Sequence, residues 1–235
     1  MNVKKITAQL GFTGFMAMAL VLTVPTAQAF GLPKVPSLGA SSEKAGSVDV
    51  ASLMSQQKDL MGRFNQSMNN MLIAQSLTLE AGGLKEQANL ALATAANYKE
   101  GAVHSKKAIE RDSKITADAS KAIQELMKNK TALTADGQKK LLSAVPHYAK
   151  GMADGTKLPK AFQDWTGSAK NGMSGLKTDP MGAKKLTGGL TDVTTVLTNL
   201  PSLLGTWTNT SKAFISYAGS NKVNTKDLSS AMGDL

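Results

Sequence analysis

The chain has 235 residues, with 27 basic and 17 acidic side chains, no cysteine, and aromatic residues at only 5%. Without cysteine, neither a disulfide framework nor a cysteine-based metal site can form. Alanine, leucine and methionine, which favour helices, dominate the apolar residues, whereas residues that favour strands are sparse. The composition therefore predicts an all-α protein that is held together by packing alone.

The excess of positive charge is carried almost entirely by lysine. Only Arg63 and Arg111 are arginines. Lysine lacks the bidentate fork with which arginine reads phosphates and base edges, and few aromatic residues are available for base stacking. We therefore expect no nucleic-acid partner. A diffuse lysine surface is typical of a soluble protein, or of one that is weakly attracted to anionic lipid or polysaccharide.

Residues 1–29 have the layout of a secretory signal peptide. Lys4 and Lys5 form a basic start, an uncharged run is most apolar over 15–24, and Ala27 to Ala29 supply small residues for cleavage. We therefore expect a periplasmic or secreted chain that begins at Phe30. Loss of two lysines with the leader would leave 25 basic and 17 acidic residues, a net charge of +8.

An uncleaved membrane anchor is the alternative for this leader. Residues 6–24 are uncharged, and their number is close to the roughly 20 residues that span a bilayer. Polar residues dilute the first half of the run, so cleavage is favoured. No cysteine follows the cleavage site, which excludes a lipoprotein anchor.

After the leader, residues 30–47 are rich in glycine, proline and serine, which predicts a flexible lead-in to a single helical domain over 48–235. The first helix is predicted over 48–79, because its apolar residues recur three and four positions apart. Three methionines in this stripe recur every seven residues, namely Met54, Met61 and Met68. The stripe is interpreted either as core or as an adaptable binding groove.

Gly82 and Gly83 separate this helix from a second one, predicted over 84–129. Its small and apolar residues recur at steps of four and three, which is a heptad-like seam, and its opposite face carries lysines and acids. Asp112 and Ser113 mark a place where the segment could instead break into two helices. The two long segments predict an antiparallel pair as the spine of an elongated helical bundle.

The rest of the chain predicts shorter C-terminal helices that pack on this spine. They are expected over 135–152, 159–165, 180–200 and 202–217, with a last turn that ends near 232. Pro146 should kink the first of them and Pro201 should bend the chain between the last two. Asp179 and Pro180 form a helix start signal.

One segment, 193–217, contains a single charged residue, Lys212. Its threonines and asparagines make it too polar for an ordinary lipid-facing span. It is interpreted as a helix buried in the bundle, as an amphipathic hairpin that meets another protein, or as a segment that reaches a membrane after a conformational change. The candidate contact residues are Met54, Met61, Met68, Leu200, Leu203, Leu204 and Trp207.

No pattern of residues points to catalysis. His104 and His147 have no second ligand at helical spacing, and the chain lacks a thiol, a G-x-S-x-G elbow and a phosphate-binding loop. We therefore expect a protein that is not an enzyme and uses no metal or cofactor. A hydrolase is a third alternative, which only pairs of acidic side chains leave open. Its predicted function is to bind a protein partner or itself at the envelope, the cell surface or the matrix.

A second function follows from an architectural resemblance. Long alanine-rich helices combined with an uncharged, glycine-containing segment resemble exported α-helical pore-forming toxins. The resemblance involves no shared motif, and no residue role is carried over from it. It implies a membrane-active helical protein as the alternative function.

Overall fold

The computed structural model describes residues 49–98, 102, 105–129, 132–176 and 179–233. The chain divides into two units, residues 1–44 and 45–235, and every described residue belongs to the second unit. The predicted signal peptide, the predicted lead-in and His104 lie outside the described residues.

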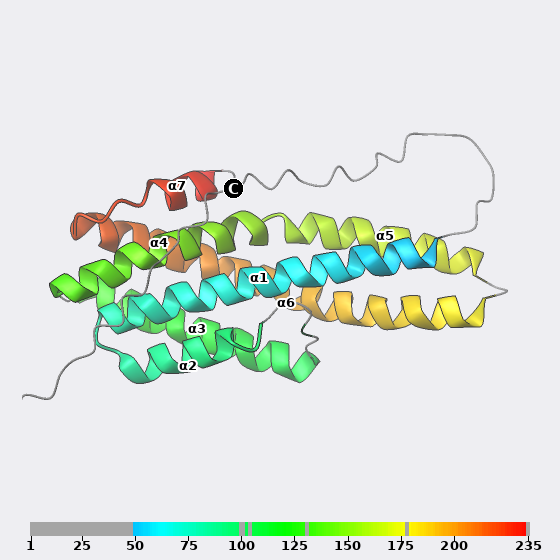
Figure 1. The fold of residues 1–235 in the computed structure, drawn as a ribbon, viewed down its shortest axis with the longest axis horizontal. Helices are drawn as coiled ribbons and strands as arrows, with labels where there is room; N and C mark the ends of the chain where they lie inside the picture. The colour runs from blue at the N-terminus through cyan, green and yellow to red at the C-terminus, as the bar shows by residue number, and fades with distance from the viewer. Residues whose placement is uncertain (1–48, 99–101, 103–104, 130–131, 177–178, 234–235) are drawn as a thin grey trace, which may run out of the picture. The chain divides into compact units, whose positions relative to one another are not determined.

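The described residues form an all-α helical bundle and contain no strand (Figure 1), which confirms the predicted fold class. The helices are α1 (Val50–Ala81), α2 (Lys85–Ala95), α3 (Lys106–Lys128), α4 (Ala135–Gly155), α5 (Leu158–Gly175), α6 (Pro180–Ser220) and α7 (Lys226–Gly233). The first helix agrees with its predicted range to within two residues. It begins after Asp49, whose side chain accepts a hydrogen bond from the Ser52 N–H at 3.1 Å.

The long second helix is not continuous. α2 ends at Ala95 and α3 begins at Lys106, so the prediction of one helix over 84–129 is wrong. The alternative break at Asp112 is also wrong, because this residue lies inside α3. The new helix starts where the Ser105 hydroxyl caps the Ala108 N–H at 3.2 Å. The seam kept its spacing across this connection, so periodicity could not reveal the break.

The C-terminal half contains fewer and longer helices than predicted. α5 has 18 residues where only a short helix was expected, and α6 is one helix of 41 residues that runs through Pro201. Leu200 and Leu203, on either side of this proline, are both buried in the core. Their shared packing explains how the helix continues despite the hydrogen bond that proline cannot donate.

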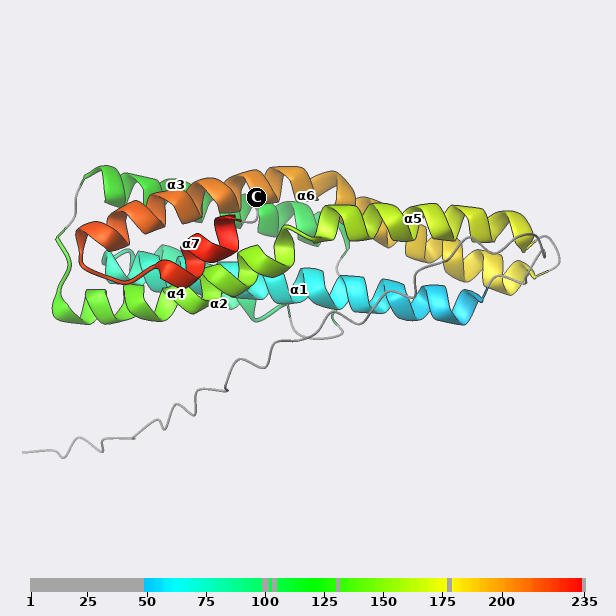
Figure 2. The same ribbon diagram turned by 90° about the horizontal axis from the view of Figure 1, so that it is seen from above.

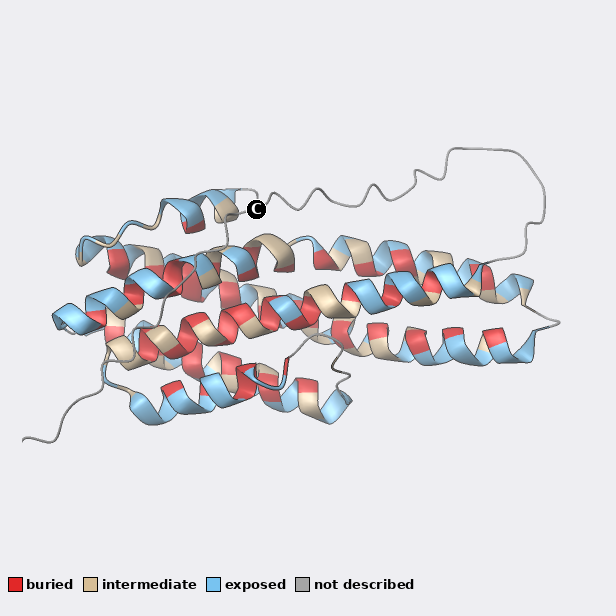
Figure 3. Ribbon diagram, in the orientation of Figure 1, coloured by how far each residue is buried: buried red, intermediate tan, exposed pale blue. Residues whose placement is uncertain are grey.

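α1 is the central helix, and it packs against α2, α3, α4, α5 and α6. Figures 1 and 2 show α5 and the first half of α6 beside the N-terminal half of α1, with α2, α3 and α4 around its C-terminal half. The second half of α6 packs against α3, and α7 covers α4. Buried residues line the faces that the helices turn toward one another (Figure 3).

Polar side chains of α1 bind backbone carbonyl groups of its neighbours. The donor–acceptor distances are 2.8 Å from Ser76 to Ala88 of α2, 3.0 Å from Gln75 to Thr116 of α3, and 2.8 Å from Asn65 to Ala102 in the α2–α3 connection. In return, the Trp165 indole of α5 donates to the Leu53 carbonyl of α1 at 2.7 Å. Each bond satisfies a buried polar group that would otherwise oppose folding.

Gly155 allows α4 to approach α6. A Cβ atom at this position would lie 2.8 Å from the ring of Trp207, which is fully buried. We predict that Gly155→Ala lowers the free energy of unfolding by about 1–3 kcal/mol, because the ring has no space into which to move. Urea denaturation followed by circular dichroism measures this change.

Gly167 of α5 is the matched control. A Cβ atom there meets nothing within 4 Å, so Gly167→Ala should raise the free energy of unfolding by about 0.5–1 kcal/mol through helix propensity alone. If both variants stabilised the protein, the close approach of Gly155 to Trp207 would be contradicted.

Candidate functional site

The contact residues predicted from the sequence lie mainly inside the bundle. Met68, Leu200 and Trp207 are 0% exposed and Leu203 is 2% exposed, whereas Met54, Met61 and Leu204 are partly buried against the same core. The apolar half of the 193–217 segment is therefore core in this folded state, the first of its three interpretations. A partner cannot reach the buried side chains unless the bundle opens.

The surface that α6 leaves to solvent is uncharged between Lys185 and Lys212. Every exposed residue between Lys185 and Lys212 is uncharged. Met181, Lys184 and Lys185 precede this stretch on the same side of α6, since positions three and four apart share a face. We call the whole set the outward face of α6; its members are Met181, Lys184, Lys185, Thr187, Gly188, Thr191, Thr194, Thr198, Pro201, Ser202, Gly205, Asn209 and Lys212.

Threonine hydroxyls on this side of α6 donate hydrogen bonds to backbone carbonyl groups four residues earlier in the same helix. The donor–acceptor distances are 2.9 Å from Thr187 to Ala183, 3.0 Å from Thr191 to Thr187, 3.0 Å from Thr195 to Thr191, and 2.8 Å from Thr198 to Thr194. The hydroxyl hydrogens of these four threonines are thus used within the helix. Such a surface can be covered by a partner without stripping water from a charge.

A shallow hollow adjoins the outward face where the start of α3 meets the middle of α6. Its volume is about 210 Å³, and its lining residues are Lys106, Glu110, Thr194, Thr195, Thr198 and Asn199. Ligand pockets usually measure about 300–1,000 Å³. This hollow is below that range, so it suits one side chain or head group of a partner better than a whole substrate.

A buried polar cluster connects α2 with α3. Asp112 is 0% exposed, and its carboxylate accepts a hydrogen bond from the Arg111 Nε at 2.7 Å. The phenol of Tyr98, just beyond α2, lies close enough to this carboxylate to feel its negative charge. Burial, and then the negative charge of Asp112, raise the pKa of Tyr98 well above its ordinary value. The phenol is therefore neutral at physiological pH.

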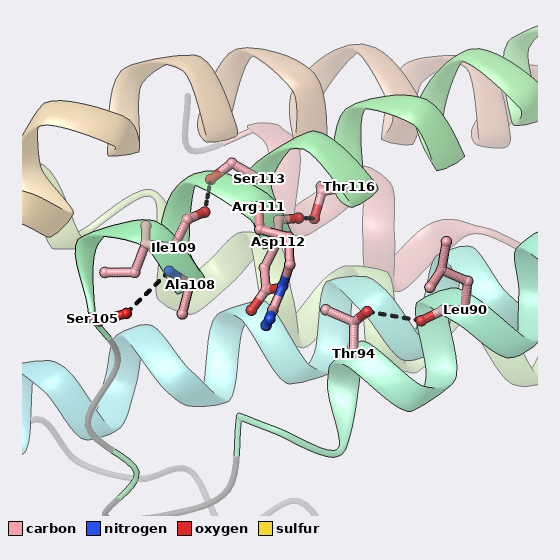
Figure 4. A network of polar contacts seen from close by, with 9 residues as sticks. All are labelled: Leu90, Thr94, Ser105, Ala108, Ile109, Arg111, Asp112, Ser113 and Thr116. Atoms are coloured by element: carbon pink, nitrogen blue, oxygen red, sulfur yellow. Dashed lines mark hydrogen bonds and ion pairs between the residues drawn. The ribbon is translucent and has the colours of Figure 1, made fainter.

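Figure 4 shows this part of α3, with the Arg111 and Asp112 side chains turned toward α2. The Thr116 hydroxyl donates to the Asp112 carbonyl at 3.0 Å, one turn further along the helix. Arg111 pairs with one oxygen of the Asp112 carboxylate and the Tyr98 phenol lies beside it, so we interpret these three residues as a clamp between α3 and the chain just beyond α2. Asp112 lies three residues after Ile109 and four before Thr116, and this spacing among seam positions is the sequence signal for a buried, paired carboxylate.

We predict an energetic coupling between Tyr98 and Asp112. Asp112→Ala should lower the free energy of unfolding by about 1–3 kcal/mol, because the buried phenol would lose the polar group beside it. Tyr98→Phe should cost much less in the Asp112→Ala background than in the wild type. A double-mutant cycle by urea denaturation should give a coupling of at least about 0.5 kcal/mol; additive effects would contradict the clamp.

His147 of α4 forms a polar contact with Asn70 of α1. Its Nδ1 lies 3.0 Å from the Asn70 Oδ1, and the Asn70 Nδ2 donates to the Gln66 carbonyl at 2.8 Å. Because the amide nitrogen is already engaged, the amide oxygen accepts and the His147 Nδ1 carries the proton. Burial, and then the positive charge of Lys150, lower the pKa of His147 below its ordinary value.

This shift makes stability depend on pH. The unfolded chain binds a proton at His147 more readily than the folded chain, so protonation favours unfolding. As pH falls below about 6.5, the free energy of unfolding should decrease, and this loss should stop once the folded histidine is also protonated. His147→Gln should reduce the pH dependence between pH 7.5 and 5.5, measured by urea denaturation. An unchanged dependence would contradict the assignment.

Among the described residues, no three histidine, aspartate or glutamate side chains gather closely enough to hold a metal ion. Within the same ranges, no helix is long and apolar enough to cross a membrane. Comparison with protein-family models, with curated proteins and with solved structures gives no match for this chain.

Proposed function

We propose that the protein is an exported, non-enzymatic helical protein that binds a partner at the cell envelope, the cell surface or the matrix through the outward face of α6. One observation carries the proposal: the exposed residues of α6 between Lys185 and Lys212 are all uncharged, on a chain whose net charge is +10. Export is supported by the layout of residues 1–29.

The exposed face of α3 has a different composition. Two of its lysines form ion pairs with acids one turn away, at 3.8 Å between Lys106 and Glu110 and 2.5 Å between Lys114 and Asp118. Charged faces of this kind are ordinarily solvated, whereas the centres of binding interfaces are depleted in charge. The lower charge of its exposed face therefore favours α6 over α3 as the contact surface.

The alternative function, a membrane-active helical protein, is supported by one feature of the same face. Met181 is 68% exposed, and Lys184 and Lys185 lie one turn from it. An exposed apolar side chain with adjacent lysines is typical of residues that meet a membrane interface.

The absence of cysteine allows a direct test of the proposed contact surface. Thr198→Cys would place a unique thiol on the outward face of α6, and Gln124→Cys would place one at an exposed position of α3. In cells that export the chain, a maleimide reagent should modify the thiol at 198 at least tenfold more slowly than in the purified protein, because a bound partner covers it.

The thiol at 124 should react equally fast in both settings. Equal reactivity at 198 in cells and in the purified protein would contradict the proposed contact surface. Fractionation of the same cells, with N-terminal sequencing of the exported product, tests the cleavage before Phe30. Retention of the full-length chain in the cytoplasm would contradict export.

A further inference from the structure

Among the residues that the structure describes, the lysines on the outward face of α6 form no ion pairs of the kind found on other helices. On α5, Lys160 binds Asp164 four residues later at 3.0 Å. In contrast, Lys184, Lys185 and Lys212 have no acid three or four residues away in either direction. Their charges are therefore not compensated within the helix.

α6 also presents no exposed acid. Asp192 is the only acidic residue between Pro180 and Ser220, and it is partly buried beside Gln57, at 3.5 Å from the Gln57 Nε2. Asp179 precedes the helix, and its carboxylate caps the Gly182 N–H at 2.9 Å. The nearest acid on α3 is Glu110, at the hollow, where it pairs with Lys106. The face is thus complementary to a negatively charged surface.

The remaining residues of the outward face favour a lipid surface over an anionic polysaccharide as the negatively charged partner. Met181 is more exposed than any other large apolar side chain in the described part of the chain. Beyond it, the exposed residues form an uncharged strip, mainly threonine and glycine, that leads to Lys212. A sulfated or carboxylated polysaccharide offers no apolar layer to Met181, whereas the interface of a bilayer does.

We infer that the outward face of α6 binds peripherally to the surface of an anionic phospholipid bilayer, with Lys184, Lys185 and Lys212 at the head groups and Met181 inserted among them. This inference rests on the proposed function and names the partner for its contact surface. The uncharged strip between the lysines lies along the membrane plane, and the buried face of α6 stays in the bundle.

Co-sedimentation with vesicles tests the inference. The exported chain should bind vesicles that contain 30% phosphatidylglycerol in phosphatidylcholine, and should bind pure phosphatidylcholine vesicles at least tenfold more weakly. Lys184→Gln combined with Lys185→Gln should lower the partition coefficient roughly 30-fold. Circular dichroism should show that the variant is folded, because both side chains are exposed.

The matched control is Lys121→Gln combined with Lys128→Gln, which removes the same charge from exposed positions of α3. It should change the partition coefficient less than threefold. Equal losses in both double variants would show that net charge alone drives binding and would overturn the inference. Equal binding to vesicles with and without phosphatidylglycerol would overturn it as well.

Met181→Gln separates lipid from polysaccharide. It should weaken vesicle binding roughly fivefold, because the thioether loses its apolar contact, and should leave binding to dextran sulfate unchanged. Equal effects on the two probes, or no effect on either, would overturn the choice of lipid. If the thiol at 198 were protected in cells but the protein bound no vesicles, this inference would fail and the proposed function would stand.

Discussion

The structure depends on the polar side chains that α1 buries against its neighbours. A buried amide or hydroxyl opposes folding unless it forms a hydrogen bond. Each buried donor on α1 therefore restricts the neighbouring helix to positions that place a backbone carbonyl group beside it. Ser76 fixes α2 in this way, and Gln75 fixes α3. The seam of α2 and α3 consists largely of small side chains, which tolerate sliding. The directional bonds from α1 supply the register that such a seam lacks.

This register also determines which side of α6 faces the solvent. The large apolar side chains of α6 fill the space beside α1, α3 and α4, where Trp207 packs against the glycine at the end of α4. Once these positions are used for the core, the other side of the helix contains mainly threonine, glycine and serine. The fold thus converts an uncharged sequence into a buried apolar side and an exposed uncharged side.

Sequence reasoning recovered the fold class, the limits of α1 and the start of α6, because composition, periodicity and the Asp179 cap are local signals. It missed the break between α2 and α3, since the spacing of small residues continued across it. It also proposed Leu200, Leu203 and Trp207 as contact residues. Hydrophobicity indicates that a side chain avoids water; only the tertiary structure shows that the bundle itself provides the cover.

The composition of the outward face is not explained by the stability of the helix. At exposed helical positions, threonine is less favourable than alanine or lysine by about 0.5 kcal/mol, and glycine by about 1 kcal/mol. Four exposed threonines and two exposed glycines between Lys185 and Lys212 therefore weaken α6 by about 4 kcal/mol relative to alanine. None of the six is among the buried residues of α6, so packing does not offset this cost. The proposed role in contacting a partner would account for a surface that the fold itself does not require.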